Sequence, residues 1–272
     1  MTCTKTLETQ SIRLNITFEH EIFADGEDYE EIWIALTAEE KHDFEQFVDE
    51  EDLSELIEVW QPWWSIPLPK IIEISSSGDS PDIPSARTDI PTLVDHPALT
   101  NLFQRQSPHN SVVFSVLNTL YAYTLVTRLY NGDHHSCAEL ASDNLLEIAV
   151  GLTSVVDDQP KQVEQALTLV WLKSDESSLK AVLDGRQVRA LTMLDLTVLL
   201  QQPVFVQAAL SDLHALFKRV LKQAKESQEE RQRCKSVVKK LDYFMAFCQW
   251  SHDKLVAQLP ALLRFHGKLL SY

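Results

Sequence analysis

The chain carries an uncharged stretch at 110–127, in which apolar residues fall on nearly every side of a helix. A helix that is apolar all round is buried inside a protein. Ser107 is suited to cap this helix and Pro108 to its first position, while Asn131 and Gly132 tolerate the left-handed conformation that ends a helix. The pattern predicts a central helix of about 22 residues, which is ~33 Å long.

Small and polar residues share one face of this predicted helix, because Ser115, Asn118, Thr119 and Ala122 follow the spacing i, i+3, i+4, i+7. A narrow face of this kind lets another helix cross closely. A membrane span is the alternative interpretation, since the uncharged run approaches the length that a bilayer requires. Serine, asparagine and threonine lower its hydrophobicity and no basic flank orients it, so we expect a buried helix of a soluble protein.

In the N-terminal part, the sequence pattern predicts a poorly structured lead-in, 1–26, followed by a compact acidic helical unit, 27–64. Thr37 followed by Glu40 is a capping box that opens the second of three short helices, and Pro62 ends the third. Apolar residues recur at helical spacing in each of them. These stripes consist of Tyr29, Ile32, Trp33, Leu36, Phe44, Phe47, Val48, Leu53, Leu56, Ile57 and Trp60.

Three of the six tryptophans lie close together at the end of this unit. Burying one indole removes on the order of 200 Å² from water. The cluster either fastens the short helices to the main core or stays exposed as a docking site, where large aromatics carry a disproportionate share of binding energy. On the docking interpretation, the partner-binding residues are Trp33, Trp60, Pro62, Trp63 and Trp64.

Residues 65–95 are rich in proline and serine and predict a linker, which leads into a helical domain at 96–272. Helical periodicity continues through that domain, and no strand signal interrupts it. The predicted fold class is all-α: a small acidic N-terminal helical unit plus a C-terminal multi-helix domain. That domain either packs around the buried central helix or stacks its helices as a short solenoid.

Start and stop signals place several helices within this domain. Ser136 with Glu139 forms a second capping box, and Pro160 starts the helix that follows it. Two long helices are expected at about 205–225 and 229–250. Pro260 bends or breaks the last helix.

Charge is distributed unevenly along the chain, whose net charge is −16. The segment 19–58 holds 17 carboxylates and one lysine, so it repels phosphate and is either a solvated face or a contact for a basic protein surface. Basic residues gather at 218–240, where acidic residues interrupt them and no aromatic residue is interleaved. This basic rim predicts a charged helical face or a contact with the acidic unit, and no direct nucleic-acid binding.

Sequence motifs for catalysis and for phosphate binding are missing. The four cysteines form no Cys-x-x-Cys pair and the chain starts without a signal-peptide pattern, so we expect a reduced, non-secreted compartment. His134, His135 and Cys137 come nearest to a metal site, but zinc takes four ligands, and a polar loop before a helix is the simpler interpretation. We expect no enzyme, no cofactor, no metal and no membrane contact.

Three segments carry a resemblance to a known family. They are EEIWIALTAEEKHDFEQFVDEEDLSELIEVWQPWW, TDIPTLVDHPALTNLF and FSVLNTLYAYTLVTRLYNGD. Their content and order resemble the zinc-finger HIT-domain proteins of the second type over about residues 31–250. The tryptophan-proline motif and the Leu-Tyr-Ala-Tyr helix ending in Tyr-Asn-Gly-Asp are the specific parts of this resemblance.

The chain departs from the family at its beginning. Family members start with a small zinc finger built from paired Cys-x-x-Cys steps, whereas residues 1–30 contain a single cysteine, Cys3. We therefore expect no finger in this chain. A splice form, a truncated gene model and a lineage that has lost the finger all fit this sequence.

The resemblance implies a non-enzymatic adaptor or assembly cofactor. Its implied partners are the RuvB-like AAA+ ATPases with their co-chaperone complex, together with ribonucleoprotein clients such as the U5 small nuclear ribonucleoprotein. It also implies a cytoplasmic and nuclear location. A structural helical scaffold or an interaction module unrelated to these ATPases is the alternative.

Overall fold

The chain divides into two compact units, Met1–Trp60 and Gln61–Tyr272. The computed structural model describes residues 34, 36–42, 60–66, 90–94, 103, 107–153, 159–177, 179, 185–224 and 227–270. The predicted lead-in and most of the predicted linker lie outside these residues. The acidic unit was predicted to end at residue 64, but the boundary between the two units lies after Trp60. The segment after Trp60 therefore belongs to the second unit.

In the first unit, the capping box predicted at Thr37 is confirmed. The Thr37 side chain accepts a hydrogen bond from the Glu40 amide at 3.3 Å, and the Glu40 carboxylate accepts one from the Thr37 amide at 2.8 Å. The bonds that the Thr37 amide and hydroxyl donate to the carboxylate hold the pKa of Glu40 below its usual value. The pair satisfies two backbone donors at a helix start, which is the role that the sequence pattern indicates.

The second unit is built from helices, and no strand occurs among the described residues, so the predicted all-α fold is confirmed. A short 3-10 helix precedes the main helices. In chain order the elements are η2 (Trp63–Ser65), α4 (Val112–Leu129), α5 (Ala138–Ile148), α6 (Val150–Thr153), α7 (Val163–Glu176), α9 (Arg186–Gln201), α10 (Pro203–Gln223), α11 (Gln228–Ser251), α12 (Asp253–Val256) and α13 (Leu259–Leu270).

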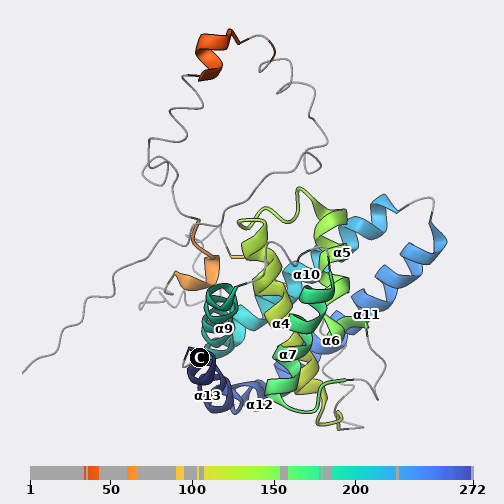
Figure 1. The fold of residues 1–272 in the computed structure, drawn as a ribbon. Helices are drawn as coiled ribbons and strands as arrows, with labels where there is room; N and C mark the ends of the chain where they lie inside the picture. The colour runs from red at the N-terminus through yellow and green to blue at the C-terminus, as the bar shows by residue number, and fades with distance from the viewer. Residues whose placement is uncertain are drawn as a thin grey trace, which may run out of the picture. The chain divides into compact units, whose positions relative to one another are not determined.

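Helix α4 occupies the middle of this unit (Figure 1). It contacts α5, α6, α7, α9, α10 and α12, and its side chains are buried from Ser115 to Thr127. Its length and composition would also suit a membrane span, as would the bent pair α9 and α10 taken together. Because 83% of the helix Val112–Leu129 is buried within the protein, packing against other helices accounts for its hydrophobicity.

The predicted end of the central helix is confirmed and its predicted start is wrong. Asn131 and Gly132 have φ values of 47° and 84°, in the left-handed region. The helix begins at Val112, with Ser111 at its N-cap position, rather than at Pro108. Ahead of it, the Ser111 hydroxyl and the His109 ring nitrogen Nδ1 lie 2.8 Å apart, and this turn replaces the predicted cap at Ser107.

The small face of α4 is the place where another helix crosses, as predicted. Gly151 of α6 lies so close that a Cβ atom there would be 2.3 Å from the Ser115 carbonyl oxygen. The Gly151 amide donates to Asn118 Oδ1 at 2.7 Å, and Asn118 Nδ2 donates to the Ala166 carbonyl of α7 at 2.7 Å. One asparagine therefore joins three helices.

Helices α10 and α11 are the two long helices that the sequence predicts, and they run alongside each other (Figure 1). Ser227 caps α11 by accepting a hydrogen bond from the Glu230 amide at 3.2 Å. The last predicted helix is broken just before Pro260, where a turn separates α12 from α13.

Two other predicted helix starts are wrong. Helix α5 begins at Ala138, and Ser136 donates to Asp133 at 2.6 Å instead of capping it. Helix α7 begins at Val163, three residues after Pro160. A turn precedes α5, whereas Pro160 and Lys161 lie in irregular chain before α7.

Candidate functional site

A buried polar network connects three elements that are far apart in the sequence. Trp63 of η2 donates from its indole nitrogen to the Tyr123 hydroxyl of α4 at 3.2 Å. Tyr123 in turn donates to Asp212 Oδ2 of α10 at 2.8 Å. A carboxylate in the core is therefore linked to the tryptophan segment through one tyrosine hydroxyl.

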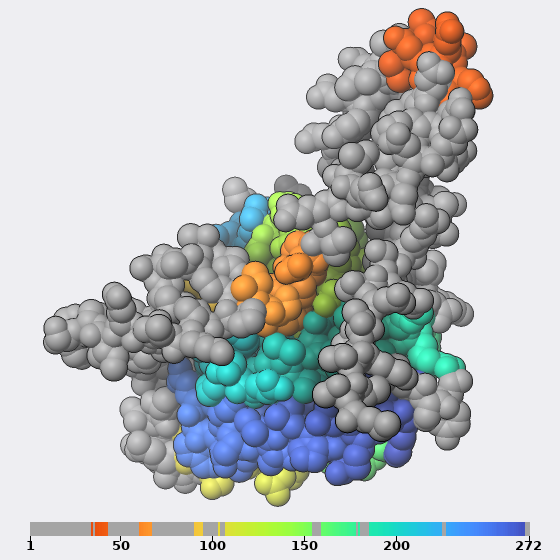
Figure 2. Space-filling view, turned by 90° about the vertical axis from the view of Figure 1, so that its left-hand side faces the viewer, coloured from red at the N-terminus to blue at the C-terminus, as the bar shows by residue number. Residues whose placement is uncertain are grey.

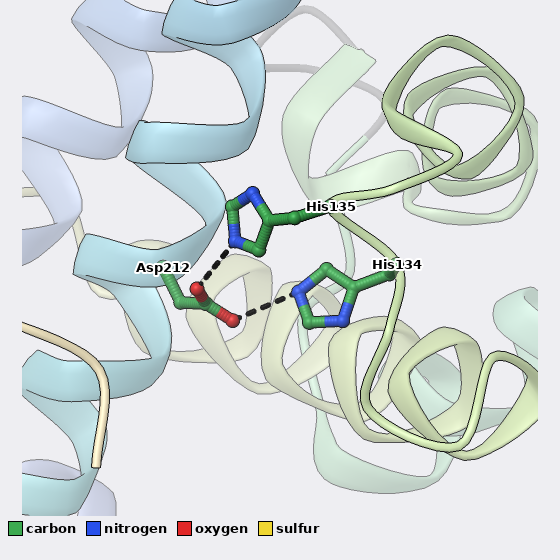
Figure 3. Close-up of side chains that lie close together, drawn as sticks. All are labelled: His134, His135 and Asp212. Atoms are coloured by element: carbon green, nitrogen blue, oxygen red, sulfur yellow. Dashed lines mark hydrogen bonds and ion pairs between the residues drawn. The ribbon is translucent and has the colours of Figure 1, made fainter. Parts of the chain in front are cut away.

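Two histidines complete this network. His134 and His135 follow the left-handed turn that ends α4, and both direct Nε2 at Asp212 (Figure 3). His134 Nε2 lies 2.9 Å from Oδ2 and His135 Nε2 lies 2.7 Å from Oδ1. Because a carboxylate only accepts hydrogen bonds, both Nε2 atoms carry the proton in this arrangement.

The environment of Asp212 determines its charge. Burial pushes the pKa of this carboxyl upward, but the hydrogen bonds and charges of His134 and His135 outweigh burial and hold the pKa below its ordinary value. Burial and the neighbouring Asp212 charge raise the pKa of Tyr123 well above its ordinary value. Asp212 is therefore the ionised centre of the network, and Tyr123 is a neutral donor to it.

The two histidines differ in exposure. The His134 side chain is buried, whereas the His135 side chain is 32% exposed. His134 Nδ1 has no hydrogen-bond partner within the described part of the chain. His134 therefore reaches the network through Nε2 alone.

The predicted partner-binding residues fall in different places. Pro62, Trp63 and Trp64 are buried, Trp60 is half-buried, and Trp33 lies outside the described residues. Trp63 packs edge-on against Trp64 and Phe205, and η2 lies against α9 on the face shown in Figure 2. Trp63 and Trp64 thus fasten a segment to the core, and a partner-binding role for the five residues stays a prediction.

Sequence reasoning missed Asp212 and Tyr123. The contacts that join these two residues to each other, to the histidine pair and to Trp63 span 60 to 89 residues, a separation that helical periodicity does not connect. One local signal was present: Ser211, Asp212 and His214 interrupt an apolar face of α10 and are buried there. Buried polar residues in an apolar run require partners. Asp212 finds them in the network, Ser211 accepts a hydrogen bond from the Val94 amide, and His214 lies 3.1 Å from Asp242.

A second polar connection ties α4 to α9. Arg128 forms a bidentate ion pair with the buried Asp195. Its Nη2 donates to Oδ1 at 2.8 Å, and its Nε donates to Oδ2. Two parallel bonds fix the relative orientation of the two side chains. The central helix is thus fixed by the ion pair of Arg128 with Asp195 at its C-terminal end and by close packing against Gly151 of α6.

Three ligand-type atoms meet in the Asp212 network. His134, His135 and Asp212 each offer one such atom, and these atoms lie within 4.8 Å of one another. Cys137, which the sequence placed beside the histidines, is half-buried and does not join this group. The arrangement can hold protons between imidazole and carboxylate, or a cation in their place.

Comparisons of the chain with family models, with curated proteins and with solved structures each find no match.

Proposed function

We propose that this chain is a non-enzymatic adaptor or assembly cofactor for RuvB-like AAA+ ATPase co-chaperone complexes in ribonucleoprotein assembly, including that of the U5 small nuclear ribonucleoprotein. The proposal rests on the resemblance of the sequence motifs to the zinc-finger HIT-domain proteins of the second type. A structural scaffold or an interaction module with other partners is the alternative.

One structural observation supports the proposal. The two specific parts of the resemblance, the tryptophan-proline motif and the Leu-Tyr-Ala-Tyr helix, are joined directly by the bond from Trp63 to Tyr123. The residues after Tyr-Asn-Gly-Asp reach the same carboxylate through His134 and His135. Segments that together resemble a family and also pack against each other are what one inherited folding unit would give.

The surface that we propose for the partner is the basic rim of α10 and α11. Its exposed cations are Lys218, Arg219, Lys222, Arg233, Lys235 and Lys239. Lys218 and Lys222 are four residues apart on α10, as are Lys235 and Lys239 on α11, so each pair lies on one helix face. Exposed charges of one sign set association rate and partner choice, which suits contact with an acidic protein surface.

An affinity pull-down from the native cell tests the proposal. The full chain is expected to recover both RuvB-like subunits, and Lys218→Glu with Lys222→Glu is expected to reduce their recovery about tenfold. The matched control is Lys161→Glu with Arg264→Glu, which makes the same change of charge at exposed positions elsewhere. Recovery of other partners without either RuvB-like subunit would support the alternative function instead.

A further inference from the structure

His134, His135 and Asp212 present the ligand types that hold divalent transition metals. Imidazole nitrogen and carboxylate oxygen suit zinc and its first-row neighbours, and two histidines with one carboxylate are a common three-ligand set with an open position. In this chain all three groups converge on one point from a loop and a helix (Figure 3).

We propose that these three residues bind one divalent transition-metal ion of the zinc class. The ligands are Nε2 of His134, Nε2 of His135 and Oδ1 of Asp212, and a water molecule fills the fourth position. This site is independent of the proposed partner surface and of the zinc finger that is typical of the resembled family.

The distances in the network are close to those that such an ion needs. Ligand atoms in a tetrahedral zinc site lie about 3.3 Å apart, as follows from bond lengths of 2.0 to 2.2 Å. His135 Nε2 is 2.7 Å from Asp212 Oδ1, and all three ligand atoms lie within 4.8 Å of one another. Shifts of about an ångström therefore convert the hydrogen-bonded cluster into a coordination shell.

The surroundings of Asp212 favour a cation. Asp212 is a buried carboxylate, and a divalent ion compensates its charge more strongly than hydrogen bonds alone. Tyr123 holds Asp212 Oδ2 at 2.8 Å and is itself held by Trp63, so the orientation of the carboxylate is fixed. His135 is 32% exposed, which gives the ion a path from solvent and room for its water ligand.

The same surroundings limit the affinity. A histidine that binds metal through Nε2 carries its proton on Nδ1, and second-shell acceptors for that proton contribute 10- to 100-fold to metal affinity. His134 Nδ1 has no such acceptor among the described residues. With three protein ligands in addition, we expect a dissociation constant on the order of a micromolar, weaker than that of a four-ligand structural zinc site.

Titration with Co²⁺ tests the site. The full chain, purified without a histidine tag and stripped of metal, is expected to develop the intense visible absorption of tetrahedral Co²⁺, saturating at one equivalent and lost when Zn²⁺ is added. His135→Ala is expected to weaken this binding at least about tenfold, because it removes a ligand outright. His109→Ala, at an exposed histidine outside the cluster, is expected to bind as the wild type does.

Melting of the metal-free variants separates ligation from folding. His135 is partly exposed, so His135→Ala is expected to melt close to the wild type, and His135→Gln replaces it if the alanine variant melts several degrees lower. The proposal is overturned if the wild type gives no intense visible absorption. It is equally overturned if a folded His135 variant binds Co²⁺ as tightly as the wild type, since the ligands then lie elsewhere in the chain.

Discussion

At the scale of single residues, Asp212 and Gly151 are the positions where the contacts to other elements leave least room for another side chain. Asp212 accepts hydrogen bonds from Tyr123, His134 and His135, and each of these partners lies 77 or more positions away in the sequence. Gly151 allows α6 to touch the backbone of α4. A substitution at either position therefore affects several elements at once.

Gly151→Ala is expected to destabilise the second unit by about 3 kcal/mol, because the added methyl group meets a backbone oxygen that cannot move aside. The contacts would be 2.3 Å to the Ser115 oxygen and 2.7 Å to the Thr119 hydroxyl. Gly267→Ala is the matched control: nothing lies within 4 Å of its added Cβ, and alanine in a helix is expected to stabilise by about 0.5–1 kcal/mol. Thermal melting of both variants measures the difference, and equal melting temperatures would contradict the close crossing.

Buried tyrosines predict a loss of stability in alkali. Burial raises the pKa of Tyr121 and of Tyr123 above the usual value, and raises the pKa of Tyr130 to about 12. In the unfolded chain tyrosine ionises near 10, so the folded state is favoured fully below pH 10 and progressively less as pH rises toward 12. Tyr121 and Tyr123 are each expected to remove about 1.4 kcal/mol per pH unit in that range.

Denaturant unfolding at pH 9, 10 and 11, followed with tyrosinate absorbance, measures this loss. Tyr121→Phe is expected to be less stable than the wild type at pH 8, since Tyr121 donates to the Arg189 carbonyl and accepts from Trp171. Its stability should fall less steeply above pH 10. A decline as steep as that of the wild type would show that Tyr121 ionises in the folded protein as freely as in the unfolded chain.

At the scale of elements, α4 and η2 determine how the second unit is assembled. Helix α4 contacts α5, α6, α7, α9, α10 and α12, while η2 lies against α9 and reaches α4 through Trp63. The short segment 60–66 thus adds two large aromatic side chains to a core made mainly by helices. Burial of aromatic surface is the dominant contribution that such a segment makes to stability.

Trp64→Ala is expected to cost about 3–5 kcal/mol, because this indole is 1% exposed and its removal leaves a cavity. Trp250→Ala is the control at an indole that is 41% exposed, and a cost of about 1–2 kcal/mol is expected there. Chemical denaturation of both variants gives the two values. A Trp64→Ala variant as stable as the wild type would show that the indole is not part of the core and would restore the docking interpretation.

Periodicity was enough to predict most helices, because local spacing of apolar residues determines which segments become helical. It predicted α10, α11 and the buried α4, and the left-handed stop at Asn131 and Gly132 followed from residue type alone. Helix starts were less predictable, although Ser136 and Pro160 have suitable chemistry. Ser136 bonds to Asp133 in a turn before α5, and α7 begins only at Val163, after irregular chain at Pro160. The Asp212 network was not predictable, since it depends on which helices become neighbours.

At the scale of the whole molecule, the chain combines a strongly acidic N-terminal part with a helical unit that carries a basic rim. The aromatic residues that first suggested a docking site are largely inside that helical unit, at Trp63 and Trp64. On the proposed function, we expect the basic rim to contact the partner, and binding through it is expected to weaken as salt rises.

Direct binding between the purified full chain and the purified pair of RuvB-like ATPases tests the central claim most directly. Isothermal titration at low and at moderate salt is expected to show saturable binding that weakens as salt rises, because the basic rim contributes to it. The control variant Lys161→Glu with Arg264→Glu should bind as the wild type does, and Lys218→Glu with Lys222→Glu about tenfold more weakly. The absence of saturable binding at low salt, with a chain that melts cooperatively, would contradict the adaptor function.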